Sequence, residues 1–141
     1  MIEVAAAIIE KDGKILIAKR KKGKHLEDKW EFPGGKIEEN ETPNDCLERE
    51  LLEEFGVKTK AGEFVAESVF DYGEGKKIRL SGYMVEYLSG DFLLNDHSEI
   101  AWVKAEDFYD YDFAPADLPI VAELRKRDYW KMKSFETTRP S

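Results

Sequence analysis

The chain has 141 residues, enough to bury the core of one domain without stapling, and a formal net charge of -8 that argues against a nucleic-acid polymer as partner. One cysteine, Cys46, and two histidines leave too few ligands for a Cys/His zinc site and suit a reducing cytoplasm. The N-terminus lacks a basic leader region and no apolar run reaches membrane-spanning length, which predicts a soluble, cytoplasmic protein without membrane contact.

The predicted elements alternate between strands and helices. Two β-rich runs, 4–10 and 14–20, surround an Asp12-Gly13 pair that predicts a hairpin turn, and the small residues 5–7 predict close packing against that strand. Later segments follow in order: a charged loop at 21–29, a short strand at 30–32, strands at 57–71, 77–87, 91–94 and 99–104, a helical turn at 105–108 and an amphipathic helix at 115–126. We expect one domain over residues 1–130 and a frayed tail over 131–141.

The stretch between the short strand and residue 57 carries the clearest helix signals. Thr42 suits the N-cap, Pro43 the first helical position and Gly56 the left-handed C-terminal position. Leu47, Leu51 and Phe55 repeat every fourth residue and form an apolar stripe. With the second helix at 115–126, this predicts an α/β fold in which a mixed sheet has one helix on each face, an α/β/α sandwich.

Three acids of this helix, Glu50, Glu53 and Glu54, share one stripe. Like charges at this spacing repel, and acids in the last turn oppose the helix dipole. Arg49 offsets only part of that repulsion. The pattern is explained by a hard divalent cation bound among the carboxylates, and the alternative interpretation is an ordinary solvated acidic face.

The spacing G-x5-E-x7-R-E-L-x-E-E-x-G-V, from Gly35 through Glu41 and Arg49 to Val57, resembles the Nudix box at every defined position. The resemblance extends to the start of the chain, to 14–20, to Trp30-Glu31-Phe32-Pro33-Gly34-Gly35 and to 114–117, as in MutT-type nucleoside triphosphate pyrophosphohydrolases. It implies the Nudix fold and hydrolysis of a nucleoside triphosphate to monophosphate and pyrophosphate, with Mg²⁺ as cofactor and Mn²⁺ as an alternative. The branch of CTP pyrophosphohydrolases and 8-oxo-dGTP diphosphatases is the most similar.

The same resemblance assigns roles in the metal site. It implies that Glu50, Glu53 and Glu54 bind the metal together with the carbonyl oxygen of Gly34, and that Arg49 orients the glutamates. A further acid comes from a late loop, where this chain has Asp96 and the relatives usually have Glu. Because Asp is one methylene shorter, the general base stays open among Asp96, Glu99 and Glu53, and the loop around Asp96 also has an ordinary turn composition.

The resemblance also places the nucleotide. Arg20 matches an arginine that contacts phosphate, a role suited to the guanidinium fork, whereas the lysines beside it are equally consistent with a solvated loop. The positions expected to line the nucleobase pocket are Ile2, Val4, Phe32 and Asp117, although the three apolar residues suit the core equally well and Asp117 could cap its helix. Tyr72 and Tyr83 are candidates for stacking on the base.

The sequence is consistent with three functions. The leading hypothesis is Mg²⁺-dependent cleavage of cytidine-type or oxidised nucleoside triphosphates in nucleotide-pool housecleaning, by a monomer or homodimer. The second is hydrolysis of another nucleoside diphosphate derivative, such as a nucleotide sugar. The third is a non-catalytic nucleotide-sensing domain, which the complete set of box glutamates disfavours.

Overall fold

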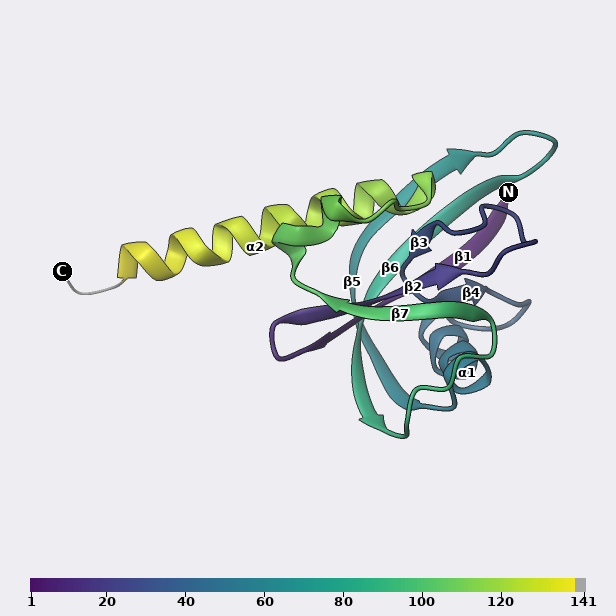
Figure 1. Ribbon diagram of the computed structural model, residues 1–141, viewed down its shortest axis with the longest axis horizontal. Helices are drawn as coiled ribbons and strands as arrows, with labels where there is room; N and C mark the ends of the chain where they lie inside the picture. The colour runs from purple at the N-terminus through teal and green to yellow at the C-terminus, as the bar shows by residue number, and fades with distance from the viewer. Residues whose placement is uncertain (139–141) are drawn as a thin grey trace.

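The computed structural model describes the backbone of residues 1–138 and the side chains of residues 1–128. Its elements, drawn in Figure 1, are β1 (Ile2–Lys11), β2 (Lys14–Arg20), β3 (Trp30–Glu31), β4 (Gly34–Lys36), α1 (Pro43–Phe55), β5 (Lys58–Asp71), β6 (Lys77–Ser89), β7 (His97–Val103), the 3-10 helices η1 (Ala105–Asp110) and η2 (Pro115–Asp117), and α2 (Leu118–Thr138).

The strands form a mixed sheet in the order β3-β2-β1-β6-β5, with β4 beside β1 and β7 beside β2. β1 and β6 run parallel and the other pairs run antiparallel. The predicted hairpin joins β1 to β2 through Asp12 and Gly13, whose positive φ values of 53° and 77° suit a tight turn. In this order β1 is the central strand, with β2 on one side and β6 on the other.

The two helices cover opposite faces of the sheet, so the predicted α/β/α sandwich is confirmed (Figure 1). On one face α1 packs against alternate residues of β1, in a buried cluster that includes Ala5, Ala7, Ile9, Leu47, Leu51 and Phe55. On the other face α2 and η1 cover the intervening residues, in a cluster that includes Ala6, Ile8, Phe108, Ile120, Val121 and Leu124. The period of two along β1 places successive side chains in different core layers.

Local signals set both ends of α1. The Thr42 side chain accepts a hydrogen bond from the Asp45 backbone N–H at 3.1 Å, and Gly56 ends the helix with φ 71°. The last turn contains no basic residue. Instead, the segment after β6 satisfies its carbonyls: Leu93 N–H donates to Phe55 O at 2.9 Å and Asn95 Nδ2 to Glu53 O at 3.3 Å. The expected strand at 91–94 is therefore wrong, because this segment caps α1 rather than joining the sheet.

Two further elements differ from expectation. Strand β4 was not predicted, and it forms because Gly34 and Gly35 pair closely with Ala6 and Ala5 of β1. Helix α2 continues to Thr138, beyond the expected end at 126, and extends past the sheet in Figure 1; residues 139–141 lie outside the described part of the chain. Within residues 1–138, no helix has the length and apolarity needed to cross a membrane.

Candidate active site

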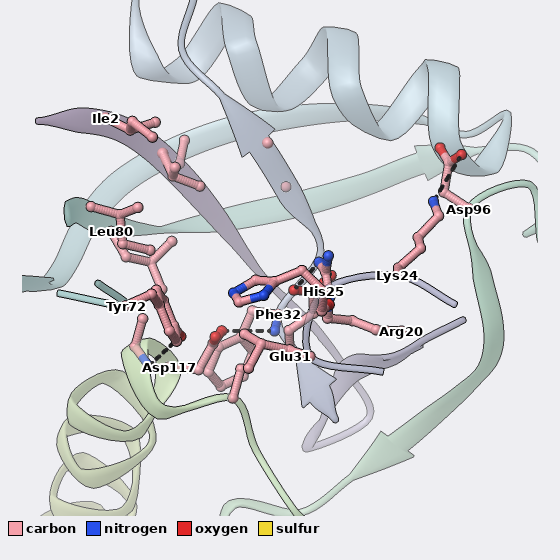
Figure 2. A pocket seen from close by; sticks show the side chains of 18 of the residues that line it. Ile2, Arg20, Lys24, His25, Glu31, Phe32, Tyr72, Leu80, Asp96 and Asp117 are labelled. Carbon is pink, nitrogen blue, oxygen red and sulfur yellow. Dashed lines mark hydrogen bonds and ion pairs between the residues drawn. The ribbon is translucent and has the colours of Figure 1, made fainter. Parts of the chain in front are cut away.

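A cavity of about 450 Å³ opens between the N-terminal half of β1, the 21–29 loop and η2. Figure 2 shows Asp117 and Tyr72 at one end and Lys24 with Asp96 at the other. Eight of the residues expected in the site line this cavity, namely Ile2, Val4, Arg20, Phe32, Gly34, Glu54, Asp96 and Asp117. The fold thus brings together positions from both ends of the chain, whereas Arg49, Glu50 and Glu53 lie beside the cavity and do not line it.

Arg49 is the centre of an ion-pair network on α1. Its Nε and Nη2 donate to the two carboxylate oxygens of Glu41 at 2.7 and 3.0 Å, and its Nη1 donates to Glu50 at 3.0 Å and to Glu53 at 3.2 Å. The hydrogen bond from Arg49 and another from the Glu38 backbone N–H lower the pKa of Glu41 to about 2. Glu41 therefore stays ionised and fixes the guanidinium that holds Glu50 and Glu53, as expected for an orienting arginine.

Glu54 has a different environment from its two neighbours in the box. Its carboxyl is partly buried at the cavity, and burial, with the nearby charges of Glu50, Glu31 and Asp96, raises its pKa to about 9. Among the described residues Glu54 Oε2 has no hydrogen-bond partner, although it is shielded from solvent. A shielded oxygen without a donor, surrounded by further carboxylates, is the chemistry that a hard divalent cation satisfies.

The glycines before α1 make room for this arrangement. A Cβ on Gly34 would lie 2.0 Å from the Ala5 carbonyl oxygen, and one on Gly35 would lie 2.4 Å from Glu50 Cδ. Any side chain at residue 35 would therefore displace the Glu50 carboxylate. Cys46 lies beneath the same segment, its thiol 3.6 and 3.5 Å from the carbonyl oxygens of Gly35 and Lys36, and burial raises the pKa of that thiol to about 12.

These residues fit a divalent cation in ligand type, but they do not form a preassembled cage. In the part of the chain that the structure describes, no three carboxylate, imidazole or thiol groups converge on a single point. The reason is the network described above, because Arg49 holds Glu50 and Glu53 while Glu54 faces the cavity.

The structure separates the two acids proposed for the late loop. Asp96 lines the cavity, where its Oδ1 lies 4.0 Å from Lys24 Nζ, and its charge contributes to the raised pKa of Glu54. Glu99 lies outside the cavity lining and pairs with Lys19 at 4.0 Å on an exposed part of β7. Position therefore favours Asp96 over Glu99 as the additional acid of the site.

At the opposite end, Asp117 is almost completely buried and accepts a hydrogen bond from the Phe32 backbone N–H at 3.1 Å. Burial raises the pKa of Asp117 well above its ordinary value, and the nearby charge of Glu31 adds to the shift. Among the described residues, the hydrogen bond observed at the Asp117 carboxyl comes from Phe32 rather than from an N–H group at the start of α2, so the capping alternative has no support there. Its carboxyl instead forms part of the cavity wall.

The apolar positions divide between cavity and core. Phe32 is only 3% exposed and its ring packs edge-on against Phe108, so it is a core residue that also lines the cavity. Tyr72 lines the cavity, and its hydroxyl accepts a hydrogen bond from Ala116 N–H at 3.0 Å. Tyr83 packs against Phe64 in the α1 layer, on the other face of the sheet, so the suggestion that it stacks on the base is wrong.

Glu31 and His97 are among the cavity residues to which the sequence pattern assigned no role. The Glu31 carboxylate accepts a hydrogen bond from Arg20 Nη1 at 3.1 Å and lies 2.9 Å from His97 Nε2. His97 is 66 positions away in the sequence, so no local pattern links the two residues. The only available signal was a charged residue between two core aromatics, Trp30 and Phe32, directly before the glycines.

Comparison with known proteins identifies a consistent set of relatives. The NUDIX domain family model matches residues 1–124. CTP pyrophosphohydrolase of Escherichia coli (strain K12) is 40% identical over 121 residues, covering 86% of this chain and 89% of the relative. The 8-oxo-dGTP diphosphatase of the same organism is 30% identical over 126 residues, covering 89% and 97%. The solution structure of the E. coli ORF135 protein has a TM-score of 0.78 at 36% identity, covering 100% of this chain and 94% of that one.

Proposed function

We propose that this chain, which belongs to the NUDIX domain family and is a MutT-like Nudix hydrolase, cleaves nucleoside triphosphates. The products would be a nucleoside monophosphate and pyrophosphate, and the cofactor would be Mg²⁺. The observation that carries the proposal is one cavity with acids expected to bind metal at one end and a buried hydrogen-bonding carboxyl at the other. A triphosphate with its nucleobase at Asp117 directs its phosphates toward Glu54 and Asp96. Arg20 lies between the two ends.

The chain's own residues then have separable roles. Glu50, Glu53, Glu54, Asp96 and the Gly34 carbonyl would hold a divalent cation, which would supply neutralisation of phosphate charge and activation of water. Arg49 keeps the box glutamates in register, and Arg20 offers N–H donors to the phosphate oxygens. The carboxyls of Glu54 and Asp117 are largely buried, so their charges act at a lower effective dielectric than in solution.

The nucleobase preference rests on Asp117. An ionised carboxylate only accepts hydrogen bonds, which suits the exocyclic amine of cytosine. 8-Oxoguanine instead presents the O6 acceptor beside the N7 donor, and a carboxyl satisfies O6 only when protonated. Burial raises the pKa of Asp117 and so favours its protonated form in the free protein, but a cytosine amine that donates to the carboxylate stabilises the ionised form in the complex. We therefore place CTP and dCTP first and 8-oxo-dGTP second, an order that agrees with the names and identities of the relatives above. The physiological role that follows is removal of unwanted nucleotides from the precursor pool.

The decisive experiment incubates the protein with Mg²⁺ and a panel of CTP, dCTP, 8-oxo-dGTP and a nucleotide sugar, and identifies the products by chromatography. The expected products are nucleoside monophosphate and pyrophosphate, with the highest kcat/KM for cytidine nucleotides. Turnover of the nucleotide sugar alone, or release of inorganic phosphate as first product, would contradict the proposal. Glu54→Gln should be inactive, and Glu123→Gln, a surface residue paired with Arg127 on α2, serves as the matched control.

A further inference from the structure

We propose that Glu31 and His97 are positioning residues that hold the Arg20 guanidinium at the middle of the cavity, ready for the substrate phosphates. The proposal rests on the proposed function, because it adds two residues that act through Arg20. Glu31, Arg20 and His97 all line the cavity, and they come from β3, β2 and β7. Figure 2 shows Glu31 and Arg20 between the Asp117 end and the Asp96 end.

Two of the three nitrogens of Arg20 are already committed. Nε donates to the backbone carbonyl of His25 at 2.7 Å, and Nη1 donates to Glu31 Oε1 at 3.1 Å and to Oε2 at 3.3 Å. Among the described residues, Nη2 forms no hydrogen bond to the protein. The planar guanidinium is therefore fixed from one side, while its remaining N–H donors are available to an accepting ligand.

His97 in turn fixes Glu31. Its ring is 4% exposed and stacks on Phe55, the last residue of α1, with 5.4 Å between ring centroids and 10° between planes. Nε2 lies 2.9 Å from Glu31 Oε2, so it donates to the carboxylate while the stack prevents the imidazole from turning. Contacts thus run from the end of α1 to Arg20 through the side chains of His97 and Glu31.

The charge of Glu31 makes this role testable. A carboxylate in a cavity that binds a polyanion repels the ligand, so electrostatics alone predict tighter triphosphate binding when that charge is removed. The positioning role predicts the reverse, because Arg20 would lose its orientation and the phosphates would lose a pre-aligned donor. The two interpretations therefore differ in the sign of the effect.

The first test examines the free protein. The side-chain ¹⁵N signals of Arg20, identified by their loss in Arg20→Lys, report how fast the guanidinium protons exchange with water. We expect the Arg20 Nη protons to exchange several-fold faster than in the wild-type protein in both Glu31→Gln and His97→Phe. The phenylalanine ring at position 97 retains the stack on Phe55. Wild-type exchange rates in the two variants would overturn the proposal, whatever the protein's substrate.

The second test measures binding of a CTP analogue with a methylene bridge between the α- and β-phosphorus atoms, by calorimetry with Mg²⁺ present. Glu31→Gln should raise Kd by about tenfold, with a smaller rise in His97→Phe. In the double variant with Glu31→Gln and Arg20→Lys, the Kd should equal that of Arg20→Lys alone, because both changes remove the same contact between Arg20 and the phosphates. Unchanged or tighter binding in Glu31→Gln, or additive effects, would overturn the proposal.

The controls separate this proposal from the function on which it rests. Glu123→Gln removes a carboxylate paired with an arginine outside the cavity and should bind the analogue as wild type does. If wild-type protein fails to bind the analogue, or Arg20→Lys leaves Kd unchanged, the proposed function fails while the exchange experiment still decides the positioning role. If Arg20→Lys weakens binding and the two other variants do not, Glu31 and His97 have no positioning role. Should Glu31→Gln not fold, His97→Phe carries both tests.

Discussion

Asp117 and Phe32, 85 positions apart in the sequence, are joined by a hydrogen bond in which the Phe32 backbone N–H donates to Asp117 Oδ1 at 3.1 Å. This bond anchors η2, which leads directly into α2, to the segment before Gly34 and Gly35. It also leaves Asp117 Oδ2 as the atom available to a ligand. The residue at position 117 therefore influences both the shape of the cavity and the hydrogen-bonding pattern that it presents.

We expect Asp117→Asn to shift nucleobase preference toward 8-oxo-dGTP. An asparagine can keep the bond from Phe32 through Oδ1 while Nδ2 presents a donor to the cavity, which suits the O6 acceptor of 8-oxoguanine. The ratio of kcat/KM for 8-oxo-dGTP to that for CTP should rise by an amount equivalent to about 1–3 kcal/mol. Steady-state kinetics with both substrates measures it, and an unchanged ratio would leave the base preference unassigned.

The same substitution should also stabilise the protein at alkaline pH. The pKa of Asp117 is raised by burial, so the folded state binds its proton more tightly than the unfolded state does. Stability consequently falls as pH rises from the ordinary value of about 3.9 through the raised pKa. Asp117→Asn removes that loss, and its melting temperature should exceed that of wild type by more at pH 8 than at pH 5. Asp112→Asn, at an exposed residue paired with Lys29, is the control.

Glu53→Gln and Glu54→Gln should each lower kcat by orders of magnitude while the fold survives. Their effects on stability without metal should differ. The pKa of Glu54 is raised to about 9, so its ionisation opposes folding at neutral pH and Glu54→Gln should raise the melting temperature. Glu53 is exposed and pairs with Arg49, so Glu53→Gln should change the melting temperature little. Near wild-type hydrolysis in both variants would refute the metal assignment.

The position of attack is tested with ¹⁸O-labelled water. Hydrolysis of the type proposed for MutT-like enzymes attacks the β-phosphorus, and the label should then appear in pyrophosphate. Mass spectrometry of the separated products distinguishes this from attack at the α-phosphorus, which labels the monophosphate. Label in the monophosphate would assign the chain to a different mechanism within the family.

Glu41→Gln should impair catalysis without removing any expected metal ligand. Glu41 holds two of the guanidinium nitrogens of Arg49, and Arg49 holds Glu50 and Glu53. Loss of the charge should let Arg49 move and reduce kcat by about tenfold or more. Glu38→Gln, at an exposed acid 3.7 Å from Arg49, is the matched comparison and should retain most activity. Equal effects of the two substitutions would show that Glu41 has no special orienting role.

The sequence predicted well what local chemistry determines. The bounds of α1 follow from Thr42, Pro43 and Gly56, whose preferences act within one turn. Strand β4 was not predictable in this way, since two glycines have little strand preference and pair only because β1 lies alongside. The link between Glu31 and His97 is likewise tertiary, and alternation along β6 had to be known before Tyr83 could be placed on the α1 face.

Cys46 gives the chain a practical property. It is the only cysteine, it is fully buried beneath the glycine segment, and its raised pKa keeps it in the unreactive thiol form. A cysteine introduced on the exposed surface, for instance at Lys24, should then react with a maleimide probe far faster than the native thiol. Spectroscopic labels can thus be attached to the rim of the cavity in the otherwise unmodified protein, with no need to remove Cys46.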